Sequence, residues 1–181
     1  VGTSSMEAIV IIFERRIGSL ERLMLAPVSL AALLGGKMLG GMIFGLTVTA
    51  VVLAVALAVF GVGGVNWVML VLALLLSAAA FAGLGAFVSV AVREIFEAQT
   101  LANFIRFPMM FLGGVFVPLA SIPVALQWIA RLLPLTYCVE ALRAALSGGM
   151  WAAAWIDLIA LLGFAVILFI LAVGVLARRA E

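Results

Sequence analysis

A long uncharged stretch determines what kind of protein this chain can form. No Asp, Glu, Lys or Arg occurs between Met38 and Val92, whereas a helix needs only ~20 consecutive apolar residues to cross a bilayer. The stretch is long enough for two spans, and the glycine-rich segment Gly61–Asn66 is typical of a turn between them. We therefore expect membrane-spanning helices over 33–60 and 67–92.

The composition of the 181-residue chain agrees with an integral membrane protein. Hydrophobic residues make up 68% and charged residues 10%, against about 45–50% and about 25% in soluble domains. The net charge of +2 is too small for an electrostatic footprint on DNA, so we expect no nucleic-acid partner. The chain has no histidine and one cysteine, Cys138, which excludes an internal disulfide and histidine-based catalytic triads. We expect no catalytic residue, no metal and no cofactor.

Two further stretches are long enough to span a membrane. The first, 99–119, contains Arg106 and Pro108, so we expect a kinked span. The second, 152–177, ends at a pair of arginines. Residues 1–13 are mostly apolar and indicate the end of an upstream span. The expected fold is an all-α, polytopic transmembrane helical bundle of about four full spans, forming one domain over 1–181.

Residues 120–149 predict two helices that are too short to span. Pro134 ends the first helix and Gly148-Gly149 ends the second. Each would have about 12 residues, or ~18 Å, against ~30 Å of hydrocarbon. We predict a re-entrant pair of half-helices, with a plain amphipathic surface loop as the alternative. Glu140 and Arg143 are three positions apart and could pair on the second helix.

A third amphipathic segment covers 14–29. Ile17, Leu20 and Met24 fall on one helical face, charges of both signs surround them, and Pro27 ends the pattern. A helix of this kind suits either a protein partner or the anionic membrane surface.

The basic residues predict an orientation. If 14–37, the turn after 92 and the C-terminal end are cytoplasmic, seven basic residues lie inside: Arg15, Arg16, Arg22, Lys37, Arg93, Arg178 and Arg179. Only Arg131 and Arg143 would then lie on the outer side. The positive-inside rule therefore places 120–149 outside. Arg106 has two open interpretations, snorkelling to the cytoplasmic surface or a role in a polar pathway.

Gly35-Gly36-Lys37 does not form a phosphate-binding loop. Met38 follows the lysine where the nucleotide-binding pattern requires Ser or Thr, and Ala31 occupies the position of its first glycine. The small residues here favour close helix packing instead, within one chain or between two. They recur every four residues as Gly36 and Gly40, Gly41 and Gly45, and Ala78, Ala82 and Ala86.

Three stretches together resemble the membrane subunit of ABC-2 type transporters, in particular the drug-exporter branch. The first is ERRIGSLERLMLAPVSLAALLGGKML, which departs from the family pattern at Arg16 and Ser19 and otherwise matches at Glu14, Arg15, Gly18, Glu21, Leu23, Pro27, Val28, Gly36 and Lys37. The second is FPMMFLGGVFVPLASIP, with its Phe-x-Pro pattern. The third is LLPLTYCVEALRAALSGG, with Pro-Leu-Thr-Tyr and Glu-Ala-Leu-Arg signatures. The resemblance extends over nearly the whole chain.

This resemblance implies a multi-pass permease of the cell inner or plasma membrane that lacks ATPase activity of its own. Two permease chains, identical or different, would pair with a cytoplasmic ABC ATPase subunit, and the family's first spans would lie upstream of Val1. The 14–29 segment would be the cytoplasmic coupling helix, through Glu14, Arg15, Gly18, Ser19, Leu20, Glu21 and Leu23. The 120–149 hairpin would close the pathway outside. The pathway and this external gate would use Arg106 of the 99–119 stretch and Pro134, Tyr137, Glu140 and Arg143 of the hairpin.

The sequence therefore favours the permease part of an ATP-driven exporter of a lipid-like or drug-like molecule, surrounded by membrane lipid. The alternative is a non-transporting membrane scaffold that assembles through its small-residue helix faces. A co-purifying ATPase would separate the two hypotheses.

Overall fold

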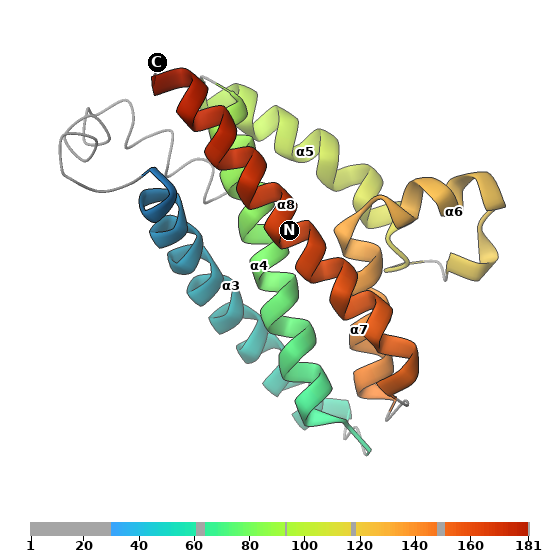
Figure 1. Ribbon diagram of the computed structural model, residues 1–181. Coiled ribbons are helices and arrows are strands. Elements are labelled where there is room, and N and C mark those ends of the chain that lie inside the picture. Colours follow the sequence, from blue (N-terminus) through green and yellow to red (C-terminus); the bar gives the residue numbers. More distant parts are fainter. Residues whose placement is uncertain (1–29, 61–63, 93, 117–118, 148–150, 181) are drawn as a thin grey trace.

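Every secondary-structure element in the described part of the chain is a helix. The computed structural model describes residues 30–60, 64–92, 94–116, 119–147 and 151–180. The elements are α3 (Leu30–Phe60), α4 (Trp67–Ala91), α5 (Ile95–Leu112), the short 3₁₀ helix η1 (Leu119–Ser121), α6 (Val124–Arg131), α7 (Pro134–Leu146) and α8 (Trp151–Ala180) (Figure 1). The all-α prediction is confirmed. The predicted upstream span end and coupling helix, 1–13 and 14–29, lie outside the described residues.

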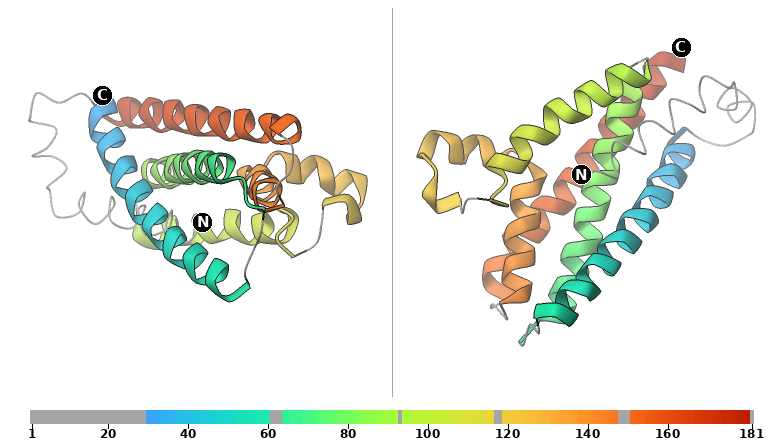
Figure 2. Two further views of the ribbon diagram at one scale, coloured as in Figure 1. Left: turned by 90° about the horizontal axis from the view of Figure 1, so that it is seen from below. Right: turned by 180° about the vertical axis from the view of Figure 1, so that it is seen from behind.

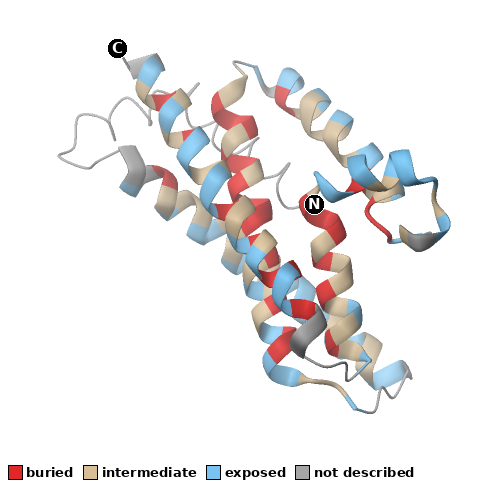
Figure 3. Ribbon diagram, turned by 45° about the vertical axis from the view of Figure 1, so that its right-hand side comes forward, coloured by how far each residue is buried: buried red, intermediate tan, exposed pale blue. Residues whose placement is uncertain are grey.

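Helix α4 lies at the centre of the bundle. It contacts α8 along its length, α7 along part of it and α3 on another side (Figure 2). Buried residues follow one another along it from Met69 to Val90 (Figure 3). Small residues permit this packing: a Cβ added to Gly83 would lie 3.2 Å from Cβ of Leu168 on α8. The predicted small-residue face of α4 is buried at Ala82 and Ala86, while Ala78 is half-buried.

Asn66 fixes the start of α4 and joins it to α7. Its side-chain oxygen accepts a hydrogen bond from the main-chain N–H of Met69 at 3.2 Å, as a helix N-cap does. Its own main-chain N–H donates to the carbonyl of Ala145 at 2.9 Å. The α3–α4 turn and the end of α7 therefore lie together, at the same end of the bundle as the start of α8 (Figure 1). The start of α5 and the last residues of α8 lie at the opposite end.

Three of the described helices are long and apolar enough to cross a membrane: Leu34–Val59, Trp67–Ala91 and Ala154–Arg178. Their outward side chains are large and apolar, as lipid contact requires. Examples from α3 are Leu39, Ile43, Phe44, Val51 and Val55.

Helix α5 differs from the span predicted over 99–119. It begins earlier, at Ile95, and ends earlier, at Leu112, where Gly113 and the positive-φ residue Gly114 turn the chain (φ +79°). It leaves the bundle obliquely toward α6, and α7 then continues toward the α3–α4 turn (Figures 1 and 2). Two helices, α5 of 18 residues and α7 of 13, therefore each follow part of the length of the bundle, where the sequence predicted one span. The fourth full span stays a prediction.

Candidate functional site: the α6–α7 pair

Helices α6 and α7 are the two short helices that the sequence predicts, but they bury unequal surfaces. Helix α6 has 8 residues. Its apolar side chains Leu126 and Ile129 are exposed, and Ala130 is its buried residue. Helix α7 is built into the bundle and contacts α4 and α8. Its buried residues are Pro134, Leu135, Thr136, Cys138, Ala141 and Ala145. The candidate site is therefore α7 and the segments bonded to it.

The Pro-Leu-Thr-Tyr sequence joins the two helices. Pro134 occupies the first turn of α7, where a main-chain N–H would have no partner within the helix, so that the proline costs no hydrogen bond. The buried hydroxyl of Thr136 donates to the carbonyl of Ala130 at 2.6 Å, and the hydroxyl of Tyr137 donates to the carbonyl of Arg131 at 2.8 Å. These bonds satisfy carbonyls that the end of α6 leaves without helical partners. The motif thus holds α6 at a defined place on α7.

Tyr137 also connects α7 to α8. Its ring lies 5.9 Å from the ring of Phe164, measured between centroids, at an interplanar angle of 43°. One side chain therefore bonds the end of α6 through its hydroxyl and packs on α8 through its ring.

Arg143 attaches α7 to the turn that follows α5. Its Nη2 donates to the carbonyl oxygen of Gly114 at 2.5 Å. The start of α7 meets the same turn, because a Cβ added to Gly113 would lie 3.0 Å from Cγ of Leu135. Gly113 and Gly114 are both buried. This corner is therefore closed by one polar contact and one close van der Waals contact.

Glu140 faces a second carboxyl group. Its side chain lies within hydrogen-bonding reach of Asp157 on α8, which is buried. The predicted pairing of Glu140 with Arg143 is thus not what the structure favours, because the two side chains have different partners on different elements. Residues three positions apart on a helix are close enough to pair. Here, however, Arg143 reaches the turn after α5 and Glu140 reaches α8.

The other predicted site residues lie away from the contacts of α7 or belong to residues that the structure does not describe. Arg106 is half-buried on α5, next to Ile105, which packs against the cluster containing Leu135 and Cys138. Arg131 is exposed, and its guanidinium lies 5.9 Å from the ring centroid of Trp128. The seven predicted coupling residues, from Glu14 to Leu23, lie outside the described residues.

Three contributors to the site were missed by the sequence interpretation. Thr136 belonged to a quoted motif, but its bond to Ala130 depends on how α6 and α7 meet. Gly114 could have been predicted as part of a turn, since a glycine commonly follows the C-terminal end of a helix. Asp157 falls inside the span predicted over 152–177, and nothing in the sequence indicated its contact with Glu140.

The chemistry of these groups is that of contacts between helices. Among the residues that the structure describes, no cluster of three or more His, Cys, Asp or Glu side chains could hold a metal ion. The polar side chains of α7 bond main-chain carbonyls or face another carboxyl group. Such an arrangement can transmit a movement of α8 to α5 and α6.

Comparison with known proteins identifies the family. The model of the ABC-2 type transporter family matches residues 1–147. The chain belongs to this family. It is 30% identical over 131 residues to the Escherichia coli (strain K12) "Inner membrane transport permease YadH", covering 72% of this chain and 50% of that protein. This ABC-2 chain therefore spans about half the length of that curated relative.

Two further relatives are of other kinds and are matched over shorter shares of their own length. "Nodulation protein J" of Sinorhizobium fredii (strain NBRC 101917 / NGR234) is 38% identical over 72 residues, which are 40% of this chain and 28% of that protein. "ABC transporter G family member 20" of Dictyostelium discoideum is 28% identical over 180 residues, which are 97% of this chain and 24% of that protein. The matches support a membrane transport subunit of an ABC transporter. Family members of this kind are membrane subunits and not themselves enzymes.

Proposed function

We propose that this protein is the permease subunit of an ATP-driven exporter in the cell inner or plasma membrane. It would move a lipid-like or drug-like molecule outward and use ATP hydrolysed by a separate cytoplasmic ABC ATPase subunit. Family membership and the three apolar helices support the membrane and transport parts of this proposal. Direction, substrate class and partner are our inference.

The observation that carries the proposal is the hydrogen-bonded position of α7. It is held to α6 by Thr136 and Tyr137 and to the turn after α5 by Arg143. A half-helix fixed in this way moves with its neighbours and can open or close a path at one end of the bundle. We infer that α6 and α7 form the outer gate, with the C-terminal end of α7 on the outer side.

Coupling to ATP would pass through the 14–29 segment. The chain has no phosphate-binding loop at Gly36-Lys37, so the movement must enter through another protein. The apolar residues Ile17, Leu20 and Met24 suit a groove on that partner, and the surrounding charges suit its rim. Residues Glu14, Arg15, Gly18, Ser19, Leu20, Glu21 and Leu23 are the proposed contacts.

Pull-down of the ATPase by the full-length permease tests this coupling. We expect wild-type protein to retain the ATPase, and Leu20→Glu or Gly18→Pro to release it while the spans stay folded. Leu25→Ala, in the same segment but off the three-residue face, is the matched control. Wild-type retention and substrate-stimulated hydrolysis in both variants would contradict the coupling assignment and favour the membrane-surface alternative.

We further propose that two permease chains, identical or different, assemble in the membrane. A Cβ added at Gly36 or Gly40 of α3 would have nothing within 4 Å, so these glycines do not serve packing against the described part of this chain. Close approach of a second chain would use them. The same observation favours the scaffold alternative, which predicts assembly without any ATP-dependent transport.

A further inference from the structure

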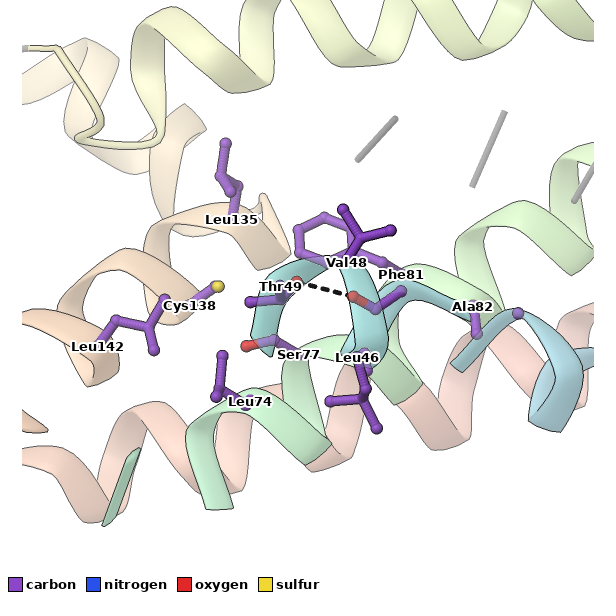
Figure 4. A pocket seen from close by; sticks show the side chains of 13 residues that line it. Leu46, Val48, Thr49, Leu74, Ser77, Phe81, Ala82, Leu135, Cys138 and Leu142 are labelled. Carbon is purple, nitrogen blue, oxygen red and sulfur yellow. Dashed lines mark hydrogen bonds between the residues drawn. The ribbon is translucent and has the colours of Figure 1, made fainter. Parts of the chain in front are cut away.

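A cavity of about 420 Å³ lies between α3, α4 and α7. Figure 4 shows Leu46 and Thr49 from α3, Ser77 and Phe81 from α4, and Cys138 and Leu142 from α7 around it. Its volume falls in the range of small-molecule sites, about 300–1,000 Å³. It is separate from the hydrogen bonds of the α6–α7 pair, because it lies on the face of α7 that meets α3 and α4.

The cavity lies at the depth of the membrane centre. Its lining residues on α3, from Gly41 to Thr49, are in the middle of the Leu34–Val59 span. Those on α4, from Leu74 to Ala82, are in the middle of the Trp67–Ala91 span. Among the described residues that line the cavity none is charged. Since an unpaired charge is costly to bury, the cavity suits a neutral molecule with a largely apolar body.

Ser77 gives this cavity a specific polar group. Its side chain is 5% exposed, and its Oγ makes no well-formed hydrogen bond to a described group, although the thiol of Cys138 lies within reach of it. The thiol of Cys138 points toward it (Figure 4), but a thiol is only a weak donor and acceptor.

The other described Ser and Thr side chains in the long helices behave differently. They turn back and donate to a carbonyl of the preceding turn, which is the usual arrangement for a helical hydroxyl. These bonds are Thr47 to Ile43, Thr49 to Gly45, Ser89 to Ala86 and Thr100 to Phe96. Ser77 is the exception: of the two hydroxyl side chains that line the cavity, Thr49 is bonded to Gly45 and Ser77 is not bonded in this way. Its hydroxyl is therefore available to a molecule in that space.

We propose that this cavity binds a neutral single-chain amphiphile from the membrane, whose hydroxyl or carbonyl group hydrogen-bonds the side chain of Ser77. The apolar chain would pack between Phe81, Leu135 and Leu142. A serine hydroxyl both donates and accepts, so it accommodates an alcohol or a carbonyl compound equally. Binding of this kind goes beyond the proposed transport function, because it needs neither ATP nor the ATPase subunit.

Photolabelling of the full-length protein in lipid nanodiscs tests the proposal. The probe is decan-1-ol carrying a diazirine on its chain, and labelled peptides are mapped by mass spectrometry. We expect labelling of cavity residues on α3, α4 or α7 that decan-1-ol competes away and that decane, which lacks the hydroxyl, competes away about fivefold less well. Ser77→Ala should weaken the competition by decan-1-ol about fivefold, the effect of losing one hydrogen bond.

Matched variants keep the test independent of folding. Ser89→Ala removes a buried serine of the same helix whose hydroxyl is already bonded to Ala86, so its labelling should equal that of wild type. Gly45→Leu fills the cavity from α3 and should abolish the labelling, while Gly163→Leu on α8, where an added Cβ meets nothing within 4 Å, should not. Labelling confined to lipid-facing residues, equal competition by decane, or full labelling of Gly45→Leu would overturn the proposal.

Discussion

The guanidinium of Arg143 donates a hydrogen bond to the carbonyl oxygen of Gly114, 29 positions away, at 2.5 Å. The two residues belong to the two C-terminal stretches that carried the family resemblance, FPMMFLGGVFVPLASIP and LLPLTYCVEALRAALSGG. The bond therefore joins the two stretches in the folded chain. The glycine-rich turn ends α5 in a conformation that presents a carbonyl, and α7 supplies the arginine that holds it.

Removing the Arg143 bond should loosen α7 from α5. We expect Arg143→Ala to lower the free energy of unfolding by about 1–2 kcal/mol, since hydrogen bonds to charged groups are stronger than average but lose part of their value in a membrane. The measurement is thermal unfolding of purified protein in detergent. Arg131→Ala is the control, because Arg131 is exposed and its contact is with Trp128. Equal midpoints for the two variants would contradict the account of this corner.

The α6–α7 junction should depend more on Thr136 than on Tyr137. Thr136→Val removes a buried bond of 2.6 Å, whereas Tyr137→Phe removes an exposed bond of 2.8 Å and keeps the ring on Phe164. We expect a loss of about 1 kcal/mol for the first and less for the second. Hydrogen exchange at α6 measures the change locally, with Ser147→Ala as control, because its bond to Ala144 is exposed and long at 3.3 Å. Unchanged exchange at α6 in Thr136→Val would show that the bond does not hold the junction.

Gly83 should be a sensitive position in the contact between α4 and α8. A leucine there would push α4 and α8 apart, because an added Cβ already lies 3.2 Å from Cβ of Leu168. We expect Gly83→Leu to abolish folded protein and Leu168→Ala to restore part of it in the double variant, as judged by size-exclusion chromatography in detergent. Gly174→Leu on α8, which meets no neighbour within 4 Å at its Cβ, should be tolerated.

Much of the helical architecture followed from the charge pattern and the glycines. The uncharged stretch from Met38 to Val92 predicted α3 and α4 to within three residues at every end, because a lipid environment admits little except a continuous apolar helix. Pro134 correctly separated two short helices, since a proline is acceptable only in the first turn. These features are local, and local sequence determines them.

The features that the sequence missed depend on distant contacts. The span predicted over 99–119 ends at Leu112, because Gly113 packs on Leu135 and the passage along the bundle continues in α7. The contact between Glu140 and Asp157 joins two helices whose relative rotation no local pattern specifies. Leu126 and Ile129 of α6 are apolar but exposed, because the helical spacing of apolar residues does not specify whether another element packs against them.

The two ends of the bundle should differ in access from outside. Ser147 caps the end of α7 and Glu97 lies in the first turn of α5. These two helix ends lie at opposite ends of the bundle (Figure 1), and the basic residues predict that the Ser147 end is external. In a Cys138→Ala background, a cysteine at Ser147 should react with an impermeant thiol reagent in intact cells, and one at Glu97 only after permeabilisation. The reverse pattern would invert the proposed orientation.

Reconstituted transport tests the central claim most directly. Full-length permease and the ATPase subunit are placed in proteoliposomes, and the entry of a fluorescent amphiphile into the lumen is followed after ATP is added outside. We predict ATP-dependent accumulation by wild type and by Arg131→Ala, and a clear loss in Glu140→Ala, whose carboxyl lies at the α7–α8 contact. The amount of assembled protein should be similar in all three. Absence of ATP-dependent accumulation with the ATPase bound would contradict the exporter account and leave the scaffold alternative.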